Sequence, residues 1–324
     1  MRRLFALLQL MRVALALTAV ADVWTLMLMN LPGRPVPPDL IARLTMAALE
    51  AFFLYCFGMT LNDLLDARRD RLFAPSRPIP SGRISPPAAI VLSIVFLMLS
   101  LFFAAMLDVT RGQLYLPGSL LVAFSAALLI VFYNSAGKFL GSIGLVTLGL
   151  IRALNSTIGR PDAHFLLLCM FLLTHITLAS LLAYQLESKR PRLRNVDFIA
   201  IAANLVIING LMFSAMIFWR QVNRELLIDS IGPALMLVIF FTWAVMQTMQ
   251  KAVPARQRGE KIMLVSLFWL FIYDASMLLS NREPASAGII ALLGVVSLTA
   301  FIIMRVLGRG VSVKRPSYRL LETK

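Results

Sequence analysis

Charged residues are scarce in this sequence, and acidic residues are the scarcest of them. Of 324 residues, 15% are Asp, Glu, Lys or Arg, whereas 59% are hydrophobic and the mean hydropathy is +0.82. A typical water-soluble domain has about 25% charged residues, which cover its surface. The composition therefore argues against a soluble globular fold and indicates a membrane protein.

Cysteine and histidine are also rare, with two residues of each type. Cys56 and Cys169 lie inside apolar runs and lack the spacing of metal ligands. They are therefore expected to behave as small hydrophobic residues, with no disulfide framework. His164 and His175 show no metal-ligand spacing either. These two residue types therefore indicate no metal centre.

Ten apolar runs are each long enough to cross a bilayer once, which takes about 20 residues of α-helix. We expect an all-α polytopic membrane protein, a bundle of nine to ten transmembrane helices, forming one integral membrane domain over residues 1–324. One of the last four runs can instead form a re-entrant segment, which enters the membrane and leaves it on the same side. The first run is expected to be an uncleaved span. The runs are Val13–Leu31, Leu40–Leu61, Pro87–Leu107, Leu114–Tyr133, Phe139–Ile158, Ala163–Tyr184, Phe198–Trp219, Leu226–Met249, Ile262–Leu279 and Ala287–Val306.

The formal charge of +15 is distributed unevenly between the two sides of the predicted bundle. If loops alternate between the sides, one side receives 23 Lys and Arg residues, and the other receives six that are balanced by six acids. This is the positive-inside pattern, and it places both termini in the cytoplasm when ten runs span. The excess of basic residues then reflects topology and attraction to lipid headgroups or phosphates, with no nucleic acid required. We expect a multi-pass protein of a bacterial inner membrane.

The segment after the second run carries an unusual set of polar side chains. If the helix continues to residue 70, about 100° per residue places Asp63, Asp66 and Asp70 on one face, with Asn62 at its edge. Like charges about 6 Å apart repel by about 3 kcal/mol at an effective dielectric of 20, so this face favours a bound cation. Oxygen ligands of this kind are typical of Mg²⁺, which completes its shell with water and substrate phosphates. The alternative is a solvated helix end with ordinary surface ion pairs.

Several motifs of the chain resemble the UbiA superfamily of intramembrane prenyltransferases. Asn62-Asp63-x-x-Asp66-x-x-x-Asp70 is similar to the first aspartate-rich motif of that family, in the same place at the cytoplasmic end of the second span. The motif Arg77-Pro78-x-Pro80-Ser81-Gly82 resembles its continuation. Further similarity lies in Arg12 with Ala21-Asp22, in Tyr133 with Lys138, and in Arg152-Ala153-Leu154-Asn155 with Gly159.

The resemblance implies an activity and a set of site residues. Members of the family hold a prenyl diphosphate through Mg²⁺, ionise its carbon–oxygen bond to an allylic cation and attach the prenyl group to an acceptor in the bilayer. By this resemblance Asn62, Asp63, Asp66 and Asp70 ligate or orient the metal. The resemblance also implies candidates for binding the diphosphate: Arg77, Arg83, Tyr133, Lys138, Arg152, Asn155 and Tyr184. For the loop arginines, the alternative is a purely topological role.

The second aspartate-rich motif of the family is reduced in this chain. At the end of the sixth run stands Tyr184-Gln185-Leu186-Glu187-Ser188-Lys189-Arg190, where only Glu187 is acidic. Glu187 can replace an aspartate as a catalytic carboxylate. In this respect the chain resembles a branch of the family encoded in bacterial ebo-type gene clusters more than the quinone or haem pathway members.

We therefore expect an Mg²⁺-dependent transferase that moves a prenyl group from a polyprenyl diphosphate to a lipophilic acceptor, aromatic or alcoholic, among membrane lipids. No obligate protein partner is evident. The alternative is a catalytically reduced member that binds or transports a polyprenyl phosphate or diphosphate. A structural subunit, for which the carboxylates are dispensable, is a third class.

Asp22, Glu50, Asp274 and Arg152 lie well inside apolar runs, where a charge costs about 2.5–3.5 kcal/mol. Arg152 is expected to face the bundle interior, with Asn155 near the same side. Glu50 can pair with Arg43, seven residues earlier, and Asp22 can help to receive the acceptor. Asp274 has no role that the sequence suggests.

Overall fold

The computed structural model describes residues 2–29, 38–113, 117–161, 166–187, 192–220, 222, 228 and 230–310. Every regular element in these ranges is a helix, which confirms the all-α expectation. The elements are α1 (Arg2–Met11), α2 (Val13–Met29), α3 (Leu40–Leu65), α4 (Ala67–Phe73), α5 (Pro86–Thr110), α6 (Gly118–Ser135), the 3₁₀-helix η1 (Gly137–Phe139), α7 (Ser142–Thr157), α8 (Leu167–Glu187), α9 (Asn195–Phe218), α11 (Ile231–Met249), α12 (Ala255–Ser280) and α13 (Pro284–Gly310).

Nine apolar segments in the described part of the chain are long enough to cross a membrane, the first combining α1 and α2. They indicate an integral, multi-pass membrane protein. Of the ten predicted runs, only the fifth is not among them, because α7 has 16 residues and a length of about 24 Å. The last four runs form helices of 19 to 27 residues, with no short re-entrant element among them.

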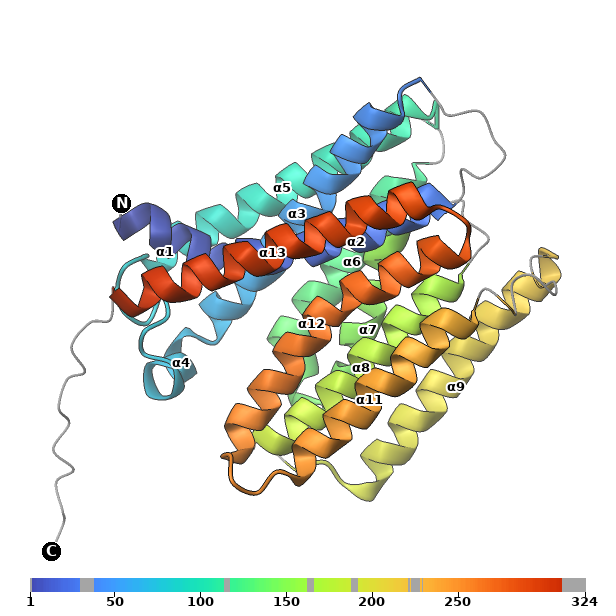
Figure 1. The fold of residues 1–324 in the computed structure, drawn as a ribbon. Helices are drawn as coiled ribbons and strands as arrows, with labels where there is room; N and C mark the ends of the chain where they lie inside the picture. The colour runs from blue at the N-terminus through green and yellow to red at the C-terminus, as the bar shows by residue number, and fades with distance from the viewer. Residues whose placement is uncertain are drawn as a thin grey trace, which may run out of the picture.

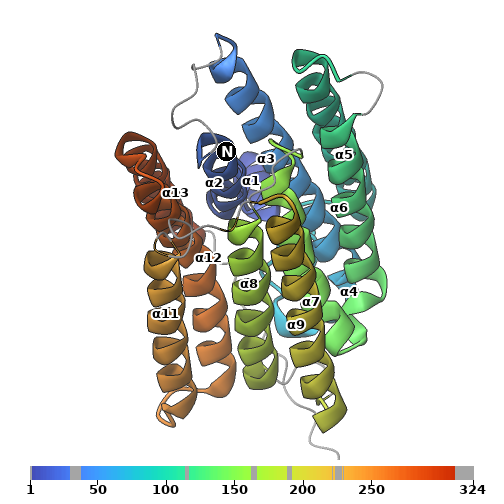
Figure 2. The same ribbon diagram turned by 90° about the vertical axis from the view of Figure 1, so that its right-hand side faces the viewer.

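The short helix α7 nevertheless connects the two ends of the bundle. Near its start, Gly144 approaches Gly137 of η1, and just after its end, Gly159 approaches Met27 at the end of α2. In Figure 2, α7 runs beside α8 and α9. With α7 included, successive long helices run in opposite directions, as the colours of Figure 1 show, which is the arrangement that the ten-run prediction requires.

The helices pack through small side chains in two connected groups. In Figures 1 and 2, α13, α2, α3 and α5 lie side by side in that order, and the same neighbours are in contact. A second group consists of α7, α8, α11 and α12, and α2 contacts both α7 and α12. Many buried positions between α3, α5 and α6 are alanines: Ala47, Ala51, Ala104, Ala123 and Ala126. Small residues allow the close helix approach that is common inside membranes.

Candidate active site

The three aspartates of the motif lie where α3 passes into α4. The helix α3 ends at Leu65 and α4 begins at Ala67, so Asp66 stands between the two. The helical hydrogen bonding continues across the break, because the Asp66 amide donates to Asn62 and the Asp70 amide donates to Asp66, both over 2.9 Å. Asp63, Asp66 and Asp70 are 2%, 5% and 4% exposed, whereas Asn62 is half-buried. The carboxylates therefore belong to the protein interior, which excludes the solvated helix end.

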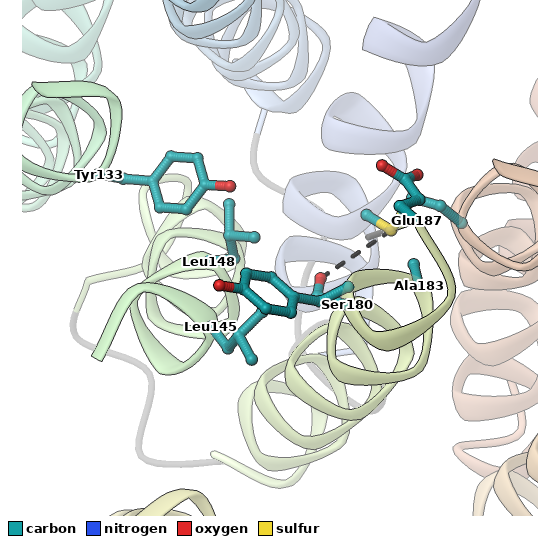
Figure 3. A pocket seen from close by; sticks show the side chains of 8 residues that line it. Tyr133, Leu145, Leu148, Ser180, Ala183 and Glu187 are labelled. Atoms are coloured by element: carbon teal, nitrogen blue, oxygen red, sulfur yellow. Dashed lines mark hydrogen bonds between the residues drawn. The ribbon is translucent and has the colours of Figure 1, made fainter. Parts of the chain in front are cut away.

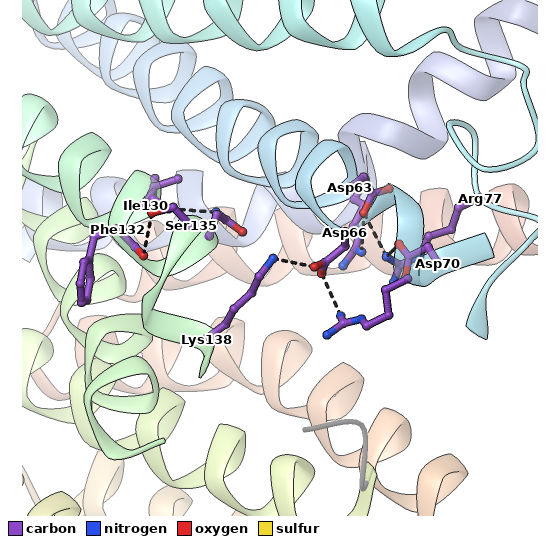
Figure 4. Close-up of polar contacts among 11 residues, drawn as sticks. Asp63, Asp66, Asp70, Arg77, Ile130, Phe132, Ser135 and Lys138 are labelled. Atoms are coloured by element: carbon purple, nitrogen blue, oxygen red, sulfur yellow. Dashed lines mark hydrogen bonds and ion pairs between the residues drawn. The ribbon is translucent and has the colours of Figure 1, made fainter. Parts of the chain in front are cut away.

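Basic side chains surround the three carboxylates (Figure 4). Arg77 forms ion pairs with Asp63, at 3.2 Å, and with Asp70. Arg69 lies 2.9 Å from one oxygen of Asp66, and Lys138 lies 2.6 Å from the other. The structure thus brings two of the predicted diphosphate ligands, Arg77 and Lys138, to the predicted metal ligands.

Arg12 completes this group and was not among the predicted site residues. Its Nη2 lies 3.4 Å from Oδ1 of Asp63. Its backbone has a φ of +48°, in the left-handed region that L-residues seldom adopt. This conformation separates α1 from α2 at the site, and such strain is often found at functional positions. The sequence signals were its resemblance, with Ala21-Asp22, to the first span of the UbiA superfamily and its place at the start of an apolar run.

Lys138 is positioned by a close approach of two backbones. It lies in η1, which packs on the start of α7. A Cβ atom on Gly144 would lie 2.1 Å from the Gly137 carbonyl oxygen, so only glycine allows this contact. Gly141, with a φ of +53°, forms the turn between η1 and α7. Two glycines therefore hold the Lys138 ammonium group against Asp66.

The loop after α4 is folded onto itself and orients two arginines differently. The Ser81 amide donates to the Arg77 carbonyl, and the Ile84 amide donates to the Pro78 carbonyl. Arg83 donates to Gln9 of α1 over 2.7 Å and to the backbone of Ser76. Partial burial lowers the pKa of Arg83. Arg83 thus fastens the loop to α1, whereas Arg77 reaches the carboxylates.

A pocket of about 160 Å³ opens between α6, α7, α8 and α12, at the same end of the bundle (Figure 3). Tyr133, Tyr184 and Glu187, all predicted from the sequence, contribute to it together with Leu145, Leu148, Ser180, Ala183 and Met263. Its wall is largely apolar, with two phenol groups and one carboxylate. Such a wall suits a lipophilic ligand that carries a polar or charged group.

Arg152 and Asn155 face the bundle interior, as expected. Arg152 is 7% exposed and forms an ion pair with Asp22 of α2. Asn155 donates to the Ala19 carbonyl over 3.0 Å. The contacts of both residues are therefore with α2 and not with the three aspartates.

The suggested pairing of Glu50 with Arg43 is wrong. Arg43 pairs with Asp39 over 2.7 Å, while Glu50 is fully buried and accepts a hydrogen bond from Ser100 of α5. Seven residues of helix bring two side chains to similar faces but about 10 Å apart along the axis. The nearer acid, one turn before Arg43, takes the arginine.

The carboxylates offer the oxygen ligands that Mg²⁺ prefers, but basic groups now contact them. Among the described residues, no three His, Cys, Asp or Glu side chains converge closely enough to hold a metal ion. The positions next to the aspartate oxygens are those of Arg12, Arg69, Arg77 and Lys138. The site thus has the donor types for a cation, and it is rich in positive charge for an anion.

Comparison with known proteins places the chain in a family. The model of the UbiA prenyltransferase family matches residues 14–190, more than half of the chain. The chain therefore belongs to the UbiA prenyltransferase family. The matched segment contains the three aspartates, their loop and the residues of α6, α7 and α8 that line the pocket.

The similar proteins include digeranylgeranylglyceryl phosphate synthases from archaea. The one from Pyrococcus horikoshii is 31% identical over 42% of this chain and 48% of its own length. That from Methanothermobacter thermautotrophicus is 33% identical over 44% of this chain and 46% of its own length. The chain thus matches about half the length of these relatives.

Comparison with solved structures covers more of the chain. A structure of a digeranylgeranylglyceryl phosphate synthase in membranes aligns with 87% of this chain and 99% of its own, with a TM-score of 0.61 and 19% identity. A UbiA homolog from Archaeoglobus fulgidus bound to GPP and Mg²⁺ aligns with 91% of this chain and 98% of its own, with a TM-score of 0.47 and 16% identity. The first of these supports the helical bundle as the UbiA fold.

Proposed function

We propose that this protein is an Mg²⁺-dependent prenyltransferase that moves a prenyl group from a polyprenyl diphosphate to a lipophilic acceptor in the membrane. The observation that carries the proposal is the cluster of Asp63, Asp66 and Asp70, which are buried among basic side chains at the end of α3. Buried carboxylates and cations together suit an ion and an anion that bind as one unit. We infer from the distribution of basic residues that this end, and both termini, face the cytoplasm.

Binding of the diphosphate would rearrange the present ion pairs. Asp63, Asp66 and Asp70 would hold the metal, with Asn62 orienting it. Arg12, Arg77 and Lys138, released from the carboxylates, would then contact diphosphate oxygens. Arginine suits this role because its planar fork of donors matches phosphate oxygens.

The chemistry is a displacement at carbon. The carbon–oxygen bond breaks with both electrons going to the diphosphate, and an allylic cation remains. When bound, Mg²⁺ supplies charge that stabilises the departing diphosphate. The basic side chains add fixed positive charge in the same place. The acceptor provides the electron pair for the new bond and loses a proton, for which Glu187 in the wall of the pocket is the candidate base.

The pocket would receive the prenyl end of the donor next to the acceptor. Leu145, Leu148 and Met263 offer apolar contacts, and the rings of Tyr133 and Tyr184 offer electron-rich faces that stabilise an adjacent cation. Exclusion of water by this wall would protect the allylic cation from hydrolysis. Between an aromatic and an alcoholic acceptor, the names of the archaeal relatives favour an alcohol.

The second candidate is a protein that binds or transports a polyprenyl phosphate or diphosphate without ionising it. The ion pairs between the aspartates and the basic residues favour it, as does the single acid, Glu187, in the pocket. This candidate predicts binding of the diphosphate with no release of it.

The test uses purified protein in lipid nanodiscs with labelled C10, C15 and C20 prenyl diphosphates, Mg²⁺ and a membrane lipid extract. We expect Mg²⁺-dependent release of diphosphate and a labelled lipid detected by mass spectrometry. Chelation of Mg²⁺, or Asp63→Asn or Asp66→Asn, is expected to abolish release while the protein remains folded. Binding without release would establish the second candidate, and full turnover by both variants would remove the role of the metal.

A further inference from the structure

A second buried charged group lies in the interior of the bundle, apart from the carboxylates at the end of α3. It is formed by Asp22 and Thr25 of α2, Arg152 of α7 and Asp274 of α12. The side chains of Asp22, Thr25 and Asp274 are 0% exposed. The helices α2, α7, α8 and α12 contact one another in a closed ring around this group. The two carboxyl groups are therefore shielded from the surface of the protein.

The charges of this group do not balance if both acids are ionised. Arg152 forms an ion pair with Asp22. Asp274 interacts with Asp22, Arg152 and Thr25, so the four side chains form one group. Within the described residues, none of the four carboxyl oxygens accepts a well-formed hydrogen bond from an N–H or O–H donor, and the Thr25 hydroxyl has no partner either. Two carboxylates in contact with only one cation would leave a net negative charge inside the membrane.

We propose that Asp22 and Asp274 share one bound proton, so that the two carboxyl groups form a hydrogen-bonded acid pair in the centre of the bundle. The proton bonds one carboxyl to the other and so joins α2 to α12. Arg152 neutralises the single remaining negative charge. The group is then neutral overall, and its carboxyl oxygens gain the donor that they otherwise lack. This site is independent of the proposed transferase activity.

The geometry favours a proton over a metal cation. A shared proton supplies the hydrogen-bond donor that the buried carboxyl oxygens of Asp22 and Asp274 otherwise lack. Among the described residues, no three acidic, His or Cys side chains converge on a metal position.

The other titratable groups that face this site are engaged elsewhere. His175 of α8 has Nδ1 3.1 Å from the Tyr273 hydroxyl and Nε2 3.1 Å from the Ser266 carbonyl oxygen. A neutral ring satisfies both contacts, with Nε2–H donating and Nδ1 accepting. Cys169 of α8 lies 3.4 Å from the Ser156 hydroxyl. Tyr55 of α3 interacts electrostatically with Arg12, Arg152 and Asp63. Arg152 is therefore the cation nearest the pair.

Infrared spectroscopy in nanodiscs tests the proposal without any assay of activity. A protonated carboxyl group has a carbonyl stretch that is distinct from that of a carboxylate and shifts in D₂O. We expect such a band in the wild type at neutral pH. Either Asp22→Asn or Asp274→Asn should remove it, because the remaining acid ionises against Arg152. Two separate variants guard against a folding defect in one of them.

Glu50 provides the matched control, because it is a fully buried acid that accepts a hydrogen bond from Ser100 and has no ion pair among the described residues. Glu50→Gln should remove the contribution of Glu50 and leave the band of the acid pair. If Glu50→Gln shows no band of a protonated carboxyl group, the proposal is overturned. A band that persists in both aspartate variants would overturn it as well. Loss of the band when choline chloride is replaced by NaCl would show that Na⁺ occupies the site, and would also overturn it.

Discussion

The ammonium group of Lys138 and the carboxylate of Asp66 form an ion pair of 2.6 Å between residues 72 positions apart in the sequence. Both side chains are almost fully buried. The contact joins η1 to the end of α3, and so connects the helices of the pocket to the aspartates. This ion pair therefore holds the two parts of the site together.

Replacement of Lys138 by Met is expected to destabilise the protein and to weaken binding of a prenyl diphosphate. Loss of one partner from a buried ion pair costs about 3–5 kcal/mol, because the other charge remains desolvated. Arg69→Met is the matched control, since Arg69 pairs with the same carboxylate but is partly exposed, and its loss should cost about 0–1 kcal/mol. Thermal unfolding in detergent measures both. Equal losses in the two variants would contradict the importance of burial.

Arg77 links two aspartates, and a double-mutant cycle can measure each link. We expect Arg77→Ala to couple to both Asp63→Asn and Asp70→Asn, with an interaction energy of about 0.5–3 kcal/mol for each pair. Arg83→Ala should couple to neither, because its contacts are with α1 and its own loop. The measurement is the free energy of unfolding of the single and double variants. Additive effects for Arg77 would show that the ion pairs contribute nothing in the membrane.

Gly144→Ala is expected to displace η1 and to impair diphosphate binding. The added methyl group would stand 2.1 Å from the Gly137 carbonyl oxygen, so one of the two backbones must move. Gly210→Ala in α9 is the control, because a Cβ there meets nothing within 4 Å. The control should be neutral or stabilising by up to about 1 kcal/mol, since alanine favours a helix over glycine. A fluorescent diphosphate analogue and the melting temperature report the two effects. If Gly144→Ala bound the diphosphate analogue as the wild type does, the position of η1 would not matter for diphosphate binding.

Leu148→Trp is expected to fill the pocket of about 160 Å³ and to discriminate against long donors. The KM for a C20 diphosphate should rise more than that for a C10 diphosphate, because the longer chain needs more of the apolar volume. Ile143→Trp, on an exposed position of the same helix, should leave both KM values unchanged. An equal rise of KM for donors of all chain lengths would indicate that the prenyl chain binds outside this pocket.

The local part of the site could be predicted from the sequence, because it depends on helical periodicity. Asp63, Asp66 and Asp70 share one side because residues three and four positions apart lie close on a helix. A different rule placed Arg152 in the bundle interior, because a charged side chain that faces lipid costs free energy. In both cases one helix and one physical rule are sufficient.

The long-range partners could not be predicted, because they depend on which helices meet. Nothing in the sequence pairs Arg12 with Asp63, or Asp22 with Arg152, across the bundle. The break of the helix at Asp66 is also invisible to periodicity, since the hydrogen-bonding pattern continues through it. The length of α7 was overestimated because the apolar run begins in η1, which has its own turn.

The position of α12 bears on how far the protein can be shortened. The family match ends at residue 190, and Asp274 stands far beyond it. A fragment that stopped at the end of the match would leave Asp22 and Arg152 at an open seam facing acyl chains, without the helix that shields them. The carboxyl-terminal helices thus belong to the same folded unit, and an expression fragment that ended at the family boundary would lack the helix that covers these charges.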